Sequence, residues 1–217
     1  MAITLNGSTG IVEANIADNA ITSNKIVSDA ITSAKIASGA VAASDLASGA
    51  ARANFGAGGV LQVVQGTSTT PSTLNPGQTF TNLPNLSVSI TPSSTSSKIM
   101  IVYHTHCGVN TENGEIMYRL ARNSSAIHIG DSRDSNTRVT YGIGDAKAGI
   151  GYAWGALLFS GCYLDSPSTI SSCTYTIQVA TGFAQGGVIY HNQQAVNSSN
   201  AEQHTGASSI VVMEIAG

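Results

Sequence analysis

Residues 86–103 read LSVSITPSSTSSKIMIVY and contain two strand patterns separated by a turn. Apolar residues alternate with serine over 86–90, which is the two-residue period of a strand with one buried face. The proline- and serine-rich segment 92–97 predicts a turn. The run 99–103 is continuously apolar and predicts a second strand. This stretch therefore predicts antiparallel β structure.

The same period continues on both sides of this stretch, from Val60 to the end of the chain. Further strands are expected at 115–120, 126–129, 153–163, 175–179 and 209–215. No long stretch shows the 3.6-residue apolar period of a helix. Eight or so short strands predict a mostly β chain whose residues 60–217 form an antiparallel β-sandwich or jelly roll.

One turn in this region has a specific sequence signature. Asn113-Gly114 is a favoured dipeptide for a two-residue hairpin turn. It predicts a hairpin between the strand ending near Gly108 and the strand starting at Glu115.

Before the β region, residues 16–51 contain a ten-residue repeat that reads IADNAITSNK, IVSDAITSAK, IASGAVAASD and LASGAA. Its apolar positions recur every five residues, a spacing that keeps one face of neither a helix nor a strand. We therefore expect a short helical turn followed by an extended step, with Thr22 and Thr32 starting the turns. Such turns cannot bury their own isoleucines, so the repeat predicts an intertwined homo-oligomer.

The expected core of this shaft consists of Ile16, Ile21, Ile26, Ile31, Ile36, Val41 and Leu46. The shaft and a glycine-rich joint together span 16–59. Residues 1–15 are expected to form a separate attachment segment, and 60–217 a distal domain.

Composition limits the classes of function. Charged residues make up 10% of the chain and the net charge is −3, against about 25% charged residues in average domains. No basic patch is present, so we expect no nucleic-acid partner. The start MAITLNGSTG lacks the pattern of a secretion signal, and the longest apolar run, 152–164, is too broken to cross a bilayer. We expect synthesis in a cytoplasm and no membrane insertion.

The three cysteines, Cys107, Cys162 and Cys173, are an odd number. We expect buried thiols, with a Cys162–Cys173 disulfide as the alternative.

Several segments resemble tail-fibre proteins of marine and freshwater bacteriophages, including cyanophages. They are MAITLNGSTGI at the start, AITSNKIVSDAITSAKIASGAV in the repeat, ITPSSTSSKIMIVYH and YLDSPSTISSCTYTIQVAT in the β region, and SSIVVMEIAG at the end. The resemblance covers most of the chain. It implies a homotrimeric fibre located on the virion.

In such a fibre the N-terminus attaches to a tail, baseplate or adaptor protein. The C-terminal β domain binds host surface polysaccharide or lipopolysaccharide. This shaft is short compared with a typical long fibre, so head attachment stays open. The alternatives are a purely structural short fibre, collar or head-fibre protein, and a tailspike-type enzyme that cleaves host polysaccharide.

Catalytic motifs are absent from the sequence. There is no Gly-x-Ser-x-Gly elbow and no phosphate-binding glycine loop. Carboxylates are paired loosely, at Glu112 and Glu115 and at Asp131 and Asp134, but both pairs are expected to be solvated loop charges. We expect no catalytic residues.

We expect no cofactor. His104 and His106 would share one face of a strand with Met100 and Val102, and we expect a structural role in which this face meets the domain core or a subunit interface. The alternative is an axial transition metal, because three copies around an axis would offer six imidazoles.

Two loops are candidates for receptor binding, 131–147 and 185–203, because both are long and polar. Tyr152 and Trp154 lie in an apolar strand and are expected in the core. The loops could also be passive surface. The candidate binding residues are Arg133, Asp134, Asn136, Arg138, Tyr141, Asn192, Gln193 and Gln194.

Overall fold

The computed structural model describes residues 22–36, 38, 40–41, 58–109, 115–143, 156–182, 187–195 and 204–217. The chain divides into two compact units, 1–51 and 52–217. The first strand of the second unit begins at Val60. Within the described ranges no helix has the length and apolar character needed to cross a membrane.

In the first unit, two short 3-10 turns recur ten residues apart, η1 (Ser23–Lys25) and η2 (Ser33–Lys35). The backbone N–H of Lys25 donates to the carbonyl of Thr22, and that of Lys35 to Thr32, both at 2.9 Å. The expected turns beginning at these threonines are confirmed.

The apolar side chains of the repeat are exposed within this single chain. Ile26 is 43% exposed, Ile31 58%, Ile36 43% and Val41 48%. Such exposure is what a repeat that buries its isoleucines only against other copies would show. Ile16, Ile21 and Leu46 lie outside the described residues.

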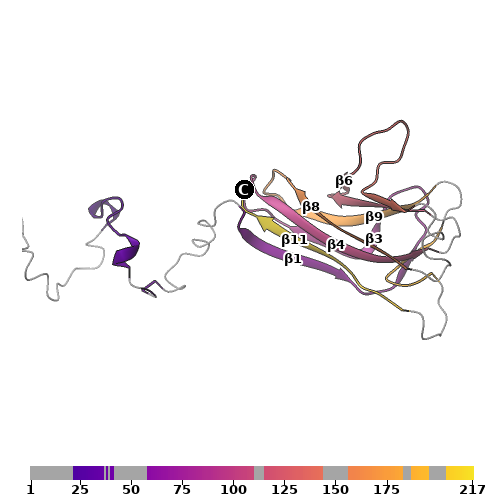
Figure 1. Cartoon of the computed structure of the whole chain (residues 1–217), viewed down its shortest axis with the longest axis horizontal. Helices are drawn as coiled ribbons and strands as arrows, with labels where there is room; N and C mark the ends of the chain where they lie inside the picture. Colours follow the sequence, from indigo (N-terminus) through magenta and orange to yellow (C-terminus); the bar gives the residue numbers. More distant parts are fainter. Residues whose placement is uncertain are drawn as a thin grey trace, which may run out of the picture. The chain divides into compact units, whose positions relative to one another are not determined.

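The second unit contains two curled antiparallel sheets (Figure 1). Sheet A consists of β1 (Val60–Ser68), β2 (Ser72–Leu74), β4 (Lys98–Val109), β8 (Ala156–Asp165), β10 (Ile189–His191) and β11 (Ser208–Ile215). Sheet B consists of β3 (Thr81–Ile90), β5 (Ile116–Arg122), β6 (Ser125–Ile127), β7 (Tyr141–Ile143) and β9 (Cys173–Thr181). The prediction of a mostly β chain is confirmed.

Strand β4 lies inside sheet A. It pairs with three strands, β8, β10 and β11. Strand β1 pairs with β11, and β2 pairs with β10. In sheet B the order is β3-β9-β5, and both β6 and β7 pair with β5.

The hairpin expected around Asn113-Gly114 is wrong. The strands on either side of it, β4 and β5, belong to different sheets and do not pair. Each of these two strands buries one apolar face in the same core, from opposite sheets.

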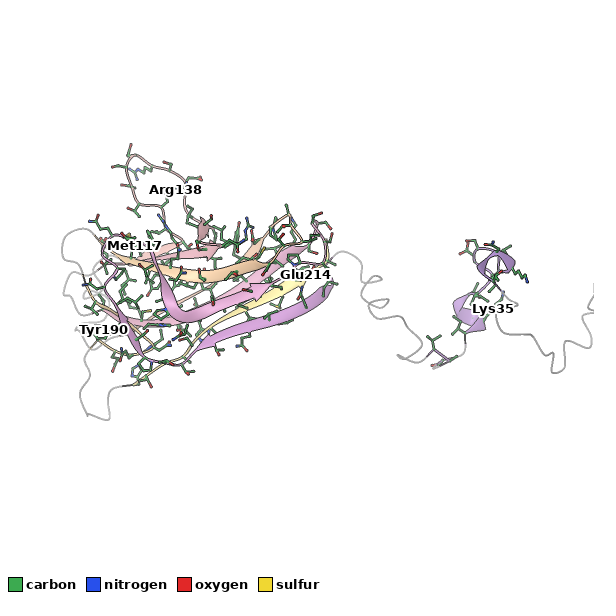
Figure 2. All side chains as sticks on the ribbon, turned by 180° about the vertical axis from the view of Figure 1, so that it is seen from behind. Lys35, Met117, Arg138, Tyr190 and Glu214 are labelled. Atoms are coloured by element: carbon green, nitrogen blue, oxygen red, sulfur yellow. The ribbon has the colours of Figure 1, made fainter. Side chains whose placement is uncertain are left out.

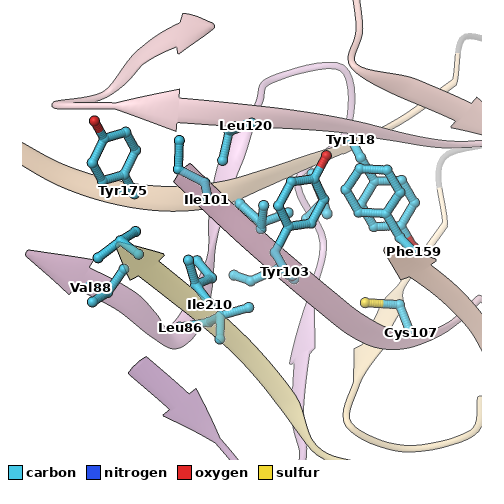
Figure 3. Packing of buried hydrophobic residues seen from close by; sticks show 14 of the residues in the cluster. Leu86, Val88, Ile101, Tyr103, Cys107, Tyr118, Leu120, Phe159, Tyr175 and Ile210 are labelled. Carbon is cyan, nitrogen blue, oxygen red and sulfur yellow. The ribbon is translucent and has the colours of Figure 1, made fainter. Parts of the chain in front are cut away.

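That core lies between the two sheets and is almost entirely aliphatic and aromatic (Figure 3). Tyr118 of sheet B stacks on Phe159 of sheet A, with ring centroids 4.3 Å apart, and Tyr103 lies 5.2 Å from Phe159. Offset ring pairs of this kind add to the free energy of burial. The two sheets are thus joined by an aromatic cluster as well as by aliphatic packing.

Four strands were not among those expected from the sequence: β1, β2, β7 and β10. The last three have only three residues each, too few to show a period. Strand β8 covers 156–163 of the strand expected at 153–163, and residues 153–155 lie outside the described residues, as do Tyr152 and Trp154.

The three cysteines differ from the expectation of buried thiols at one position. All three thiols are free, so the alternative Cys162–Cys173 disulfide is not formed. Cys107 and Cys173 are buried, but Cys162 is exposed, because it lies on the face of β8 opposite to Phe159.

Candidate functional site

The loop between β6 and β7, residues 128–140, stands clear of the two sheets (Figure 1). Every side chain from Asp131 to Arg138 is exposed. This loop contains four of the expected receptor-binding residues, namely Arg133, Asp134, Asn136 and Arg138. Within the described part of the chain, this loop therefore places these polar side chains where a ligand in solvent can reach them.

Hydrogen bonds close the base of this loop. The N–H of Gly130 donates to the carbonyl of Val139 at 3.1 Å, and Arg138 Nε donates to the carbonyl of Gly130 at 2.6 Å. Arg119 Nε of β5 donates in turn to the carbonyl of Arg138 at 2.7 Å, and the Arg119 guanidinium lies 3.6 Å from the centroid of the Phe80 ring. Arg138 thus lies at the base of the loop (Figure 2).

The tip of the loop turns at Arg133–Asn136, where the N–H of Asn136 donates to the carbonyl of Arg133 at 3.0 Å. Asp134 adopts a left-handed φ of 49°, which aspartate tolerates better than most residues. Arg133, Asp134 and Asn136 consequently present a cation, an anion and an amide from one turn. This set can donate to and accept from sugar hydroxyls.

Tyr141, the fifth expected residue of this loop, begins β7. Its ring packs on Phe159 at 5.5 Å between centroids and is 49% exposed. At the start of the loop, His128 stacks on Tyr163 at 4.5 Å. The loop is therefore held at both ends by aromatic contacts with sheet A.

The other expected binding residues, from the segment 185–203, are not exposed on a projecting loop. Asn192 is completely buried, and its amide donates to the carbonyl of Ser68 at 2.9 Å and accepts from Ser208 Oγ at 2.6 Å. Gln193 is partly buried and donates to the carbonyl of Ser72. The side-chain oxygen of Gln194 accepts from the N–H of His204. These amides stabilise the fold, and Asn192 cannot reach a ligand on the surface.

His191, beside Asn192, is a buried histidine that the sequence did not single out. Its Nε2 lies 3.1 Å from Ser208 Oγ, and its Nδ1 lies 3.5 Å from Ser72 Oγ. Burial, and secondarily the nearby His106, lower the pKa of His191 to about 4. The imidazole is therefore neutral at physiological pH and serves as a hydrogen-bonding member of the interior.

His104 and His106, the residues of the alternative metal site, lie on one face of β4, as predicted. That face points away from the core, because the alternate residues Tyr103, Thr105 and Cys107 are buried. Of the two expected structural roles, the one in which this face meets the domain core is thus wrong. His104 Nδ1 lies 3.2 Å from Ser209 Oγ, and the His106 ring lies 5.4 Å from that of His204.

No cluster of three or more His, Cys, Asp or Glu side chains suited to a metal occurs among the described residues of one chain. Burial, and secondarily His204, lower the pKa of His106. A metal at His104 and His106 would need ligands from other copies and stays a hypothesis.

Some carboxylates of the β domain are exposed and others are buried. Asp131 and Asp134 are exposed in the loop, as expected, and Glu115 is exposed beside β5. Asp165 and Glu214 are buried, and within the described part of the chain neither is hydrogen-bonded to a second carboxylate. Asp165 accepts from Arg122 and Tyr175, and Glu214 accepts from Ser93, Ser97 and Gln62.

Glu214 and Cys107 are buried groups whose pKa values are shifted. Burial raises the pKa of Glu214, but the hydrogen bonds from Ser93, Ser97 and Gln62 outweigh it and the net pKa is lowered. Burial raises the pKa of Cys107 to about 12, which leaves that thiol un-ionised.

No protein-family model matches this chain, and no curated protein is similar to it.

Proposed function

We propose that this chain is a bacteriophage fibre protein that assembles as a homotrimer, attaches to the virion through residues 1–15 and recognises the host surface through its β domain. The recognition element is the loop 128–140. Its ligand is host surface polysaccharide or lipopolysaccharide. The protein acts by binding and not as an enzyme.

The strand order supports the domain type. Sheet A reads β1-β11-β4-β8 and sheet B reads β3-β9-β5 with β6 and β7 at the far edge. This order supports a jelly roll, a double-sheet fold found in viral capsid and lectin domains. Fold alone does not give function, so the proposal depends on the loop.

One observation carries the proposal: a repeat with exposed isoleucines precedes, in the same chain, a β domain with an anchored loop whose polar residues 131–138 are all exposed. The repeat provides several copies, and the loop provides a polar contact in each copy. Weak contacts to sugars gain avidity when they are linked, because the second binding event becomes intramolecular.

Binding of the purified, fluorescently labelled full chain to a panel of aquatic bacterial strains, including cyanobacteria, tests this proposal. The triple variant Arg133→Ala/Asp134→Ala/Asn136→Ala removes the polar groups of the loop tip. We expect at least a tenfold loss of binding to the strains that bind the parent chain.

The matched control is Ser87→Ala/Ser89→Ala/Thr174→Ala, which removes the same number of polar groups from the exposed strands of sheet B. This control should bind like the parent chain. Absence of binding to every strain would favour the purely structural alternative. Shortening of purified host polysaccharide by the protein would show that the non-enzymatic assignment is wrong.

A further inference from the structure

The outer face of sheet A carries apolar side chains in register across four strands. Val63 of β1, Met213 of β11, Met100 of β4 and Leu164 of β8 form one row. The adjacent row consists of Gln65, Val211, Val102 and Cys162. We call these eight residues the apolar face.

The apolar face points to solvent in the single chain. Val63 is 59% exposed, Val102 42% and Leu164 46%. The alternate residues of the same strands, such as Ile101 and Val212, are completely buried in the core. Over these two rows the sheet is therefore apolar on both sides, although an antiparallel sheet with one wet face normally alternates apolar and polar residues.

The outer face of sheet B shows what a solvated face of this domain looks like. Ser87 and Ser89 of β3 lie opposite Thr176 and Thr174 of β9, and the hydroxyls of Ser89 and Thr174 are 2.8 Å apart. Gln178 of β9 donates to Asn82 at 3.1 Å. The contrast between the two faces is not an effect of overall composition, because both belong to one domain.

We infer that the apolar face is covered by other copies of this chain, as the interface that joins the β domains of the assembled protein. The inference uses the oligomer of the proposed function but not its receptor binding. Contiguous exposed apolar surface marks interaction sites, and the apolar face has no charged side chain with which to select a partner of opposite charge.

The proposed oligomer of the repeat points to a second copy as the partner. Isoleucines of the repeat, such as Ile31, are exposed in the single chain, and in that oligomer they are buried against other copies. Only residues 42–59 separate the described repeat from β1 of the apolar face, and a chain of this length spans at most about 65 Å. Association of the repeats thus holds the β domains of different copies at high effective concentration, which favours contact through an uncharged apolar face.

Cys162 reports directly on this interface. It is the exposed thiol of the described chain and belongs to the apolar face, whereas Cys107 and Cys173 are buried. The experiment measures the alkylation rate of Cys162 in the native full chain. The reference is the double variant Cys162→Ser/Ser89→Cys, which moves the exposed thiol to the outer face of sheet B.

We expect Cys162 to react at least tenfold more slowly than the thiol introduced at position 89 of the reference variant. Equal rates would overturn the inference. Val102→Lys introduces a charge beside Cys162 and should restore fast alkylation, while Ser89→Lys should leave Cys162 protected. Protection that persists in Val102→Lys, with an unchanged circular dichroism spectrum, would also overturn the inference.

The outcomes are independent of host binding. A protected Cys162 in a protein that binds no cell supports the interface and contradicts the receptor-binding proposal. A freely reactive Cys162 in a protein that binds cells contradicts the interface and supports the receptor-binding proposal.

Discussion

At the scale of single residues, the domain is held by a few buried polar groups with complete sets of partners. Asp165, at the end of β8, accepts from Arg122 of β5 at 2.6 Å and from Tyr175 of β9 at 2.7 Å. Glu214, at the end of β11 (Figure 2), accepts from residues of the 92–97 turn. Each carboxylate therefore joins segments that are distant in the sequence.

Removal of one partner of Asp165 should be costly. In Arg122→Met the buried carboxylate loses its cation, and we expect the free energy of unfolding to fall by about 3 kcal/mol. Chemical denaturation of the full chain measures this change. Arg133→Met, in the exposed loop, is the control and should change stability by less than about 0.5 kcal/mol.

The double variant Arg122→Met/Asp165→Asn should regain part of the loss, because no buried charge is left without a partner. A single variant as stable as the parent chain would show that this ion pair contributes nothing to the fold.

At the scale of elements, short turns and close strand contacts decide how the sheets are built. The hairpin between β5 and β6 turns through Asn123 and Ser124, whose φ angles are 49° and 69°. Positive φ at both central residues is the favoured turn for a two-residue hairpin. Asn123 Oδ1 also accepts from the N–H of Thr174 at 2.8 Å, which ties this turn to β9.

Gly66 is the point where β1 approaches β3. A Cβ atom placed on Gly66 would lie 2.2 Å from the carbonyl oxygen of Ser87. Because that atom belongs to the backbone, Gly66→Ala must displace a strand, and we expect a loss of about 1–3 kcal/mol. Thermal unfolding followed by circular dichroism measures the loss.

Gly130 serves as the control for Gly66, because a Cβ atom there meets nothing within 4 Å. Gly130→Ala should unfold at the temperature of the parent chain. Equal unfolding temperatures for both variants would contradict the close approach of β1 and β3.

At the scale of the whole molecule, the two outer faces and the buried histidine set how the protein responds to its surroundings. One face is polar and hydrogen-bonded, and the apolar face is suited to contact with another copy. Because His191 is buried, the stability of the domain is coupled to pH.

Acid should destabilise the protein through His191. Its pKa is about 4 when folded, against the ordinary value of 6.5, so the unfolded chain binds the proton more tightly. Stability is complete above about pH 6.5 and falls as the pH is lowered toward 4, by about 3 kcal/mol in total. Denaturation midpoints measured from pH 7.5 to 4 show this slope.

His191→Gln should flatten the slope across this window, whatever its effect at neutral pH. A slope that His191→Gln leaves unchanged would assign the pH dependence to another group.

The sequence alone determined the class of the fold, because the period of apolar residues is a local property. The period of two over 86–90 and the continuous run at 99–103 both correspond to strands, β3 and β4. The threonines of the repeat began the turns expected of them. The exposure of loop residues such as Arg133 also followed from local polarity.

Only the tertiary structure decided which strands pair, which loops are buried and which sheet faces are covered. Asn192 looked like a surface amide but fills an interior site beside Ser68 and Ser208. The flanks of Asn113-Gly114 separated into two sheets. Val102 shows the same limit, because its apolar character does not tell whether it lies in the core or on the outer face. These outcomes depend on contacts between residues far apart in the sequence, which local patterns do not encode.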